Sequence, residues 1–387
     1  MTTRGLIHNF TTLLLIAIAL PAAAQVNCAW LTHKRSDSSH IVVNWETKEP
    51  SRSVLEYGRT AALGERVEVG EAVVLHHVEV PFPKSGDFHY RISSDGHPPF
   101  SGRVKSYSGD VLRVALASNW QARPALECML AEDAHLLVTC GDHVSTIIDA
   151  ENPGNKANTK PFSDLVVAYQ DIFRSMPVMP ALGNHDRQFR PRGKRFPPEA
   201  TYDVDATAFL DFFPLPGDGW KWAFEIPEFD VQFVALDFNH TSDFGTTWQS
   251  CHGFDAKSEQ WNWYKELMEP SDRRFVVTVY NEMNRTMRGH GGGIWGSLFE
   301  KGTMAITGFG HFAERAEVQG FPYFNTALGT GTRYADPKAR FFAVTPSYML
   351  LTFRKGAPSV TVEIKDLEGV VLDKTSWPVG SDNNLQP

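Results

Sequence analysis

Two short motifs carry the residue types that metal-assisted hydrolysis needs. Gly141-Asp142 follows the apolar run 135–140, and Gly183-Asn184-His185-Asp186 follows the apolar run 178–182. An aspartate can bridge two metal ions, an asparagine oxygen can bind one, and a histidine can protonate a leaving group. Two metals about 4 Å apart can clamp a phosphoester and supply hydroxide. In this order and after apolar runs, the two motifs together indicate a two-metal phosphoesterase site.

The elements that must position these motifs are strands alternating with helices, and this pattern starts at residue 111. Apolar runs typical of buried strands fall at 111–117, 135–140, 178–182, 231–237, 275–280 and 304–307. Helical patterns fall at 123–132, 162–174 and 258–268. The alternation predicts an α/β fold, in which sites form at the carboxyl ends of strands. We expect closing antiparallel strands at 348–353, 359–364 and 370–374.

The preceding segment, 41–107, consists of strand and turn patterns only. β-rich runs fall at 41–47, 54–58, 73–80 and 88–92, with turn residues between them at short spacing, as in a sandwich. His76 and His77 lie within one run and are predicted to pack in the sheet. We therefore predict a small all-β domain at 25–109, followed by an α/β domain at 110–387.

The N-terminus has the pattern of a secretory signal. Arg4 and His8 precede the apolar run 13–20, which is too short to span a bilayer, and small residues continue to Ala24. We predict a signal peptide at 1–24 and a secreted or periplasmic mature protein without a transmembrane segment. The four cysteines show no CxxC spacing, so a cysteine zinc site is not expected, while disulfides and free thiols both stay open.

The charge distribution limits the classes of molecule that this protein is expected to bind. The formal net charge is −8, without a long acidic or basic run, which argues against nucleic acid as a partner. The short basic stretch 190–195 contains Pro191 and Gly193 and is predicted to be a solvated loop. The oligomeric state is not determined by these features.

On these residues the chain resembles the calcineurin-like metallophosphoesterases, and in particular their purple acid phosphatase branch, over about residues 40–375. That branch begins with a fibronectin III-like sandwich, and the runs 43–47 and 55–58 are similar to its W-x-T and Y-G strands. The resemblance implies a metallophosphoesterase β-sandwich core flanked by helices. It also implies five strand-end blocks: D-x-G/H, G-D, G-N-H-D/E, a lone His, and G-H-x-H followed by Y-E-R.

The second and third blocks are intact. By resemblance, Asp142 is the bridging metal ligand and Asn184 a further ligand. His185 is then the acid or transition-state stabiliser, oriented by Asp186. In the last block, at 308–315, His311 matches a metal ligand. The other residues of that block that match are Glu314 and Arg315.

The remaining ligand positions are substituted. In the first block Asn119 takes the aspartate position, with Ser118 as the other candidate, and Gln121 stands two residues after Asn119. Asn281 replaces the lone histidine, and Phe309 replaces the first histidine of the last block.

These substitutions weaken the implied metal centre, because neutral amides are poor substitutes for carboxylate and imidazole. One metal would depend on Asn119, Gln121, Asp142 and His311, and the other on Asp142, Asn184 and Asn281. Phe309 offers no ligand atom. We therefore expect at most one divalent metal (Fe, Zn or Mn), or none, and loss of the two-metal reaction.

For the other histidines, a role in packing or in a loop is weighed against a role in the site. His143 follows Asp142 and could turn into the site, but packing or solvent contact is predicted. The stretch 290–293 resembles an esterase oxyanion loop, yet the chain has no G-x-S-x-G motif, so a flexible glycine loop between strands is predicted. His240 and His252 lie in a polar loop region and could line a pocket.

Three functions are compatible with this pattern. The first is an exported metallophosphoesterase-like protein with a degraded site, a weak or inactive phosphoesterase retained for binding a ligand such as a phosphate ester. The second is an active metal-dependent phosphomonoester hydrolase with an unusual ligand set. The third is a structural periplasmic or cell-surface module. The retained His185 and Asp186 favour a residual site, and the substitutions at Asn281 and Phe309 favour binding over catalysis.

Overall fold

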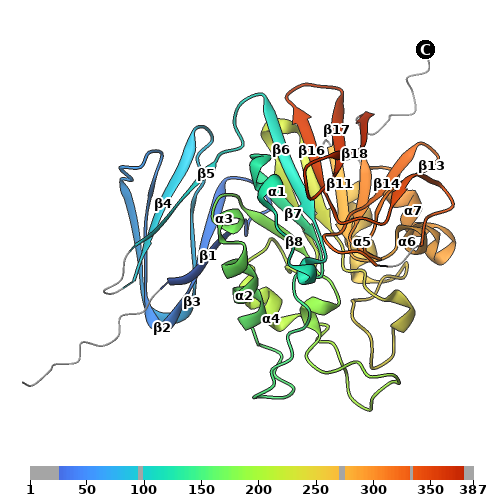
Figure 1. The fold of residues 1–387 in the computed structure, drawn as a ribbon, viewed down its shortest axis with the longest axis horizontal. Helices are drawn as coiled ribbons and strands as arrows, with labels where there is room; N and C mark the ends of the chain where they lie inside the picture. Colours follow the sequence, from blue (N-terminus) through green and yellow to red (C-terminus); the bar gives the residue numbers. More distant parts are fainter. Residues whose placement is uncertain (1–25, 95–98, 270–274, 332–333, 379–387) are drawn as a thin grey trace, which may run out of the picture.

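The N-terminal part of the chain forms one five-stranded sheet in the computed structural model, which describes residues 26–94, 99–269, 275–331 and 334–378 (Figure 1). The strands are β1 (Val26–Thr32), β2 (His40–Gly58), β3 (Glu65–Pro81), β4 (Asp87–Ser93) and β5 (Phe100–Lys105). The first half of β2 pairs with β1 and its second half with β4. Register shifts between Glu46 and Ser53 divide the two halves. The predicted signal peptide, 1–24, lies outside the described residues.

Two further sheets make up the rest of the fold. The six-stranded sheet has the order β18-β17-β16-β6-β7-β8. Its strands are β6 (Val111–Ala117), β7 (Leu136–Cys140), β8 (Val178–Ala181), β16 (Ser347–Arg354), β17 (Ser359–Asp366) and β18 (Val371–Pro378). Strands β6, β7 and β8 are parallel, as their connections through helical segments require, and β16 to β18 add antiparallel.

The seven-stranded sheet has the order β15-β13-β14-β12-β11-β10-β9. Its strands are β9 (Trp222–Ile226), β10 (Val231–Ala235), β11 (Phe275–Tyr280), β12 (Met304–Thr307), β13 (Ala313–Val318), β14 (Phe321–Asn325) and β15 (Ala339–Ala343). Strands β10, β11 and β12 are parallel. Both sheets therefore place the carboxyl ends of consecutive parallel strands along an edge, which is where the sequence motifs fall.

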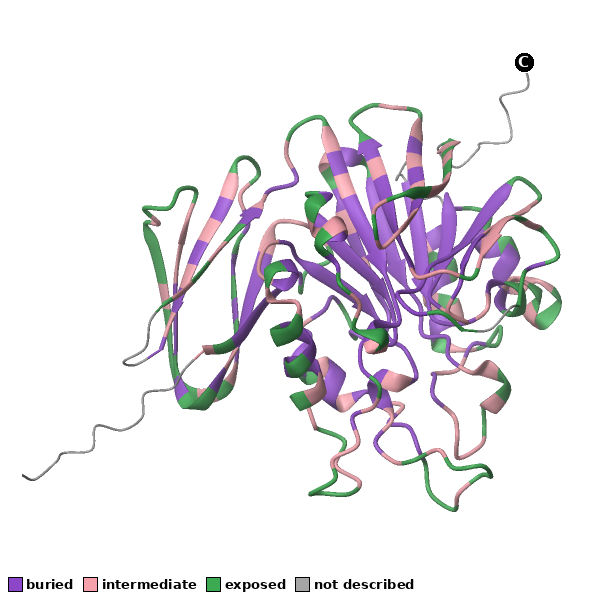
Figure 2. Cartoon of the chain, in the orientation of Figure 1, coloured by how far each residue is buried: buried purple, intermediate pink, exposed green. Residues whose placement is uncertain are grey.

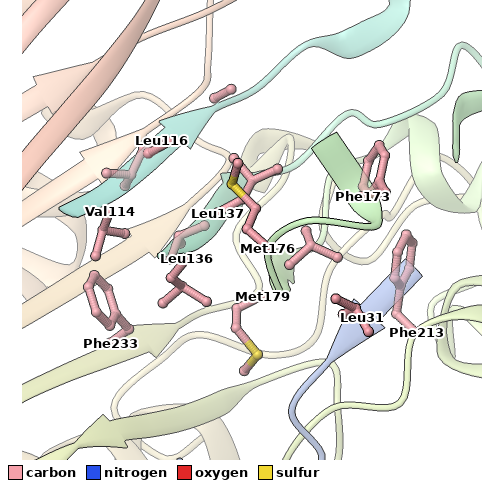
Figure 3. Packing of buried hydrophobic residues seen from close by; sticks show 14 of the residues in the cluster. Leu31, Val114, Leu116, Leu136, Leu137, Phe173, Met176, Met179, Phe213 and Phe233 are labelled. Atoms are coloured by element: carbon pink, nitrogen blue, oxygen red, sulfur yellow. The ribbon is translucent and has the colours of Figure 1, made fainter. Parts of the chain in front are cut away.

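The main hydrophobic core lies between the two large sheets. Val114 on β6, Leu136 on β7 and Phe233 on β10 belong to one buried cluster, and Figure 3 shows them pointing toward one another. Phe353 on β16 packs on Phe233, with ring centroids 6.2 Å apart. Figure 2 shows the central strands buried along their length, whereas much of β3 is exposed. The apolar runs of the sequence thus form this interior.

Short helices cover the outer faces and connect the strands. They are α1 (Glu127–Ala131), α2 (Lys160–Ala168), α3 (Gln170–Phe173), α4 (Thr207–Phe212), α5 (Glu259–Met268), α6 (Asn284–Gly289) and α7 (Ile294–Phe299). Within the described chain, no helix combines the length and apolar character that crossing a bilayer requires.

The N-terminal sheet contacts the α/β part through β1. The Gln170 side chain accepts from Ala29 N at 3.2 Å and donates to Ala29 O at 2.7 Å, as a neighbouring strand would. Trp30 stacks on Phe212 with ring centroids 3.9 Å apart. Because these contacts are buried, β1 fixes the two parts of the chain against each other.

Several sequence predictions require correction. The helix expected at 123–132 forms only at 127–131, because Arg123 has a left-handed backbone (φ 49°) and Pro124 cannot donate to a preceding turn. The helix expected at 162–174 is divided at Tyr169. The glycine stretch 290–293 lies between α6 and α7, not between strands, as a 3₁₀ turn with three left-handed glycines. The four cysteines are free thiols.

Candidate functional site

The ends of five strands from the two sheets meet in one cluster. Asn119 N donates to Gly141 O at 3.2 Å, which joins the ends of β6 and β7. A Cβ at Gly183 would lie 2.1 Å from Asp142 Oδ1, so only glycine allows this approach of β7 and β8. A Cβ at Gly308 would lie 2.3 Å from Ser118 Oγ, so β12 approaches β6 equally closely. The glycines of the motifs are therefore required by packing.

Asn119 lies at the centre of this cluster and joins two family ligand positions. Its Nδ2 lies 2.9 Å from His311 Nε2 and donates to Asp142 Oδ2 at 3.2 Å. Burial lowers the pKa of His311, although the Asp142 charge raises it, which favours a neutral ring that accepts from the amide. Ser118 Oγ lies 2.9 Å from Asn119 Oδ1 and 2.6 Å from Thr326 O. An amide thus bridges the carboxylate and the imidazole.

Asp142 is held in a left-handed conformation (φ 59°) and is almost fully buried. Its Oδ1 accepts from His185 N at 3.2 Å. Burial raises the pKa of Asp142, and the negative charge of Asp186 raises it further, whereas the neighbouring His185 lowers it. Asp142 thus contacts the His185 backbone directly and reaches His311 through the Asn119 amide.

Asp186 holds the backbone of the motif in place. The predicted role of Asp186, to orient the ring of His185, is therefore not what the structure shows. Asp186 is fully buried, and its oxygens accept from Gly183 N (2.8 Å), Asp142 N (3.0 Å) and His143 N (2.8 Å). His143 Nδ1 lies 2.9 Å from the same carboxylate. Both oxygens of the Asp186 carboxylate are therefore used in hydrogen bonds to the backbone and to His143. His143 proves to be an interior partner of Asp186, in line with its predicted packing role.

His185 is positioned by a backbone carbonyl instead. Its Nδ1 donates to Ser145 O at 2.6 Å, which leaves the lone pair of the neutral ring on Nε2. The side chain is only half-buried. His185 can therefore present Nε2 to a ligand at these strand ends.

The other substituted positions serve packing. Asn281 is buried and donates to Cys140 O at 2.6 Å, so it ties the end of β11 to the end of β7. Gln121 Oε1 is buried, and among the described residues it has no hydrogen-bond partner. The ring of Phe309 lies edge-on to that of His240, with centroids 6.0 Å apart. None of the three provides the anionic or imidazole donor that the family position implies.

Three polar residues border this cluster: sequence reasoning named His240 as a residue that could line a pocket, placed Arg192 in a solvated loop and did not name Tyr202. Tyr202 is buried; burial raises the pKa of its phenol, whereas its interactions with Arg192 and Asn184 lower it. Arg192 also pairs with Asp243 at 2.6 Å. Burial lowers the pKa of His240, while the Asp142 charge raises it. Their long loop connections gave no periodic signal, so only the folded chain reveals their position.

The side chains present do not fit a two-metal centre. Among the described residues, no group of three or more His, Cys, Asp or Glu side chains is arranged to hold a metal ion. Asp142 is the one carboxylate at the family ligand positions, and Asn119 directs its NH₂ group toward both Asp142 and His311. An NH₂ group cannot ligate a cation, so this donor set lacks the charge that divalent metals need.

The fold is that of the metallophosphoesterase family. The model of the calcineurin-like phosphoesterase family matches residues 86–311, more than half of the chain, so the chain belongs to that family. The solved purple acid phosphatase PPD1 from yellow lupin (Lupinus luteus) seeds is similar over 92% of this chain and 74% of its own, with a TM-score of 0.64 and 14% identity. That likeness shows a shared fold, a mixed α/β metallophosphoesterase architecture.

A second solved structure is GAP50, the anchor in the inner membrane complex of Plasmodium. It covers 72% of this chain and 92% of its own, with a TM-score of 0.45 and 12% identity. No curated protein matches the chain in sequence.

Glu314 and Arg315, the last two residues of the family block at 308–315, make structural contacts. Glu314 is buried, and its Oε1 accepts from Asp336 N at 2.6 Å. Arg315 pairs with Asp373 on β18 at 2.7 Å and so joins the two large sheets. Burial raises the pKa of Glu314 to about 7, and the charge of Asp336 contributes to the rise.

Glu314→Gln should stabilise the protein above neutral pH. Ionised Glu314 destabilises the folded state. This loss of folding free energy is absent below the unfolded-state pKa of 4.5 and reaches its full size above the folded-state pKa of about 7. At pH 8 the variant should gain about 3 kcal/mol over wild type, and at pH 4.5 almost nothing. Urea denaturation at both pH values measures this difference. Glu317→Gln, on the same strand but at a surface pair with Arg340, is the matched control; an equal gain at both pH values would contradict the assignment.

Proposed function

We propose that this protein is an exported metallophosphoesterase-like binding protein, in which a degraded two-metal site leaves weak or no phosphoesterase activity. One observation carries the proposal: the Asn119 amide lies between Asp142 and His311, at 3.2 Å and 2.9 Å. A hydrogen-bond donor thus occupies the place where the family needs a ligand to a cation. The Asn119 amide supplies the contact between Asp142 and His311, and this donor set does not favour catalysis by two metals.

The ligand proposed for the cleft is a phosphate ester. His185 can donate from Nε2 when protonated, since its Nδ1 is fixed on Ser145 O. Asn184 follows the same strand end, and Tyr202 interacts with both Asn184 and Arg192. Charge-assisted donors of this kind favour phosphoryl oxygens. The nearby carboxylate of Asp142 opposes an anion, which favours weak and selective binding over tight phosphate capture.

A second candidate is an active phosphomonoester hydrolase with one metal. Asp142, Asn184 and His311 remain at neighbouring strand ends, and rotation of Asn119 could turn its oxygen toward a cation. The third candidate, a purely structural module, is less favoured because His185 stays half-buried in the cleft and available for a ligand.

The finer architecture belongs to the same proposal. We infer a fibronectin III-like identity for the N-terminal sheet, because Trp45 and Tyr57 occupy the family's strand positions. The corresponding division is a signal peptide at 1–24, a β-sandwich domain at 25–109 and a metallophosphoesterase domain at 110–387. Export to the periplasm or the exterior rests on the apolar run 13–20 and the small residues before Gln25.

The purified mature protein should contain at most one tightly bound divalent metal per chain and hydrolyse 4-nitrophenyl phosphate at background rate. Elemental analysis after dialysis without chelator and a rate measurement with added Zn²⁺, Mn²⁺ or Fe²⁺ give both values. Two tightly bound metals per chain, or rapid hydrolysis, would overturn the proposal in favour of the hydrolase.

Binding is tested separately by calorimetry with 4-nitrophenyl phosphate. His185→Ala should weaken binding about tenfold, since a charged hydrogen bond contributes about 1.5–3 kcal/mol. His89→Ala, on β4 of the N-terminal sheet, is the matched control and should leave the affinity unchanged. No binding by wild type, or equal binding by His185→Ala, would leave only the structural module.

A further inference from the structure

A separate cavity of about 430 Å³ lies beside the family cleft, with Phe309 in its wall. It is bordered by the start of α6, the ends of β12 and β14, and the segment 334–336. The volume falls in the range of small-molecule pockets in proteins. Phe309 occupies the position at which the family resemblance implies a metal-binding histidine. The same residue therefore removes a metal ligand and forms part of the wall of this pocket.

Glu314 supplies to the pocket a carboxyl without a direct ion pair, although the Arg288 charge lowers its pKa. It lines the cavity, is 3% exposed, and has no ion pair with a basic side chain among the described residues. The adjacent Asp336 is already neutralised by Arg288, with Nη2 and Oδ1 2.9 Å apart. A buried carboxyl without a cation is costly, which its pKa of about 7 reflects. A ligand cation would offset this cost.

A second polar group in the same wall also lacks a partner. Asn325 is 1% exposed and donates Nδ2 to Phe309 O at 2.8 Å and to Phe312 O at 2.9 Å. Its Oδ1 is buried and, within the described chain, accepts no hydrogen bond. Because this oxygen is shielded from the cavity, Asn325 acts by fixing the backbone of Phe309 and Phe312, and Glu314 is the group that favours a ligand with N–H donors.

The rest of the wall is aromatic. Phe309 and Phe312 line the cavity, and Tyr334 stands at it with 59% of its surface exposed. Aromatic faces favour both apolar groups and cations. Arg285, the free-standing cation nearest the pocket, is exposed to solvent, which screens its repulsion of a positive ligand.

We propose that this pocket binds a small primary amine on an aromatic body, with its ammonium group paired to Glu314 and its ring between the aromatic walls. The inference is independent of whether the neighbouring cleft binds phosphate esters. An anionic ligand is disfavoured here, since Glu314 and Asp336 both present carboxylates at the pocket.

The probe for this pocket is 2-phenylethylamine, measured by calorimetry on the mature protein at pH 8. We expect a dissociation constant of about 0.1–1 mM, in keeping with a ligand of this size. The neutral isostere 2-phenylethanol should bind at least about tenfold more weakly, because it cannot form the ion pair. Saturating 4-nitrophenyl phosphate should not displace the amine, which separates this pocket from the cleft.

Two variants locate the binding. Glu314→Gln should weaken amine binding at least about tenfold while the protein stays folded, and Tyr334→Ala should weaken it a few-fold. Glu317→Gln, the matched surface control, should bind as wild type does. The proposal is overturned if wild type shows no binding below about 10 mM, or if Glu314→Gln binds the amine as well as wild type does.

Discussion

Asp237→Ala should lower the free energy of unfolding by about 3–5 kcal/mol, because it leaves Arg187 buried without a counter-charge. Both side chains are fully buried, and Arg187 donates from Nη2 to Asp237 Oδ1 at 2.8 Å. His252 adds a contact with Asp237 Oδ2 at 2.7 Å. Burial raises the pKa of Asp237, but Arg187 and His252 lower it below its ordinary value, so the carboxylate is ionised when the pair forms.

Arg187 directly follows the Asn184-His185-Asp186 motif, so the same variant should loosen the cleft. Urea denaturation measures the stability, and phosphate-ester binding measures the cleft. Asp164→Ala is the matched control: it breaks the exposed Lys160–Asp164 pair, which should contribute below about 1 kcal/mol. A loss for Asp237→Ala no larger than that of Asp164→Ala would mean that the buried pair does not hold the motif in place.

The combined variant Asn119→Asp, Asn281→His, Phe309→His should raise metal affinity and phosphomonoester hydrolysis well above wild type, by roughly 100-fold in rate. Each change restores a donor at a strand end where Asp142 and His311 already converge. Asn119→Asp also replaces the NH₂ group between Asp142 and His311 by an oxygen. Without metal, the new carboxylate repels Asp142, so added Zn²⁺ or Mn²⁺ should raise the melting temperature of this variant.

Single changes should achieve little, because a metal needs most of its ligands at once and their effects are coupled. Asn281→His is the demanding step: Asn281 donates to Cys140 O, and a Cβ at Gly141 would lie 2.8 Å from its Nδ2, so space for a ring is small. The control that replaces the same three residues by alanine removes the native contacts without adding donors. If the folded repair variant gains neither metal nor activity over that control, the family alignment of the cleft must be given up.

Local patterns allowed much of the fold to be predicted. The strands from β6 to β12 that carry site residues were apparent because continuous apolar runs end in glycine or a polar residue, a signal that depends only on neighbouring residues. Strands β1, β5, β9, β13, β14 and β15 were missed. Runs such as Ala313–Val318 mix charged and apolar residues and become strands only by pairing with neighbours.

The sequence by itself determined the family, and it predicts the order of the strand-end blocks and the substituted ligand positions, since these follow from residue types at fixed places along the chain. The tertiary structure decided what those residues do. Asp186 holds the backbone and His143 instead of orienting His185, and the Asn119 amide joins Asp142 to His311. Hydrogen-bond partners far apart in the chain depend on how two sheets meet, and no local spacing encodes that distance.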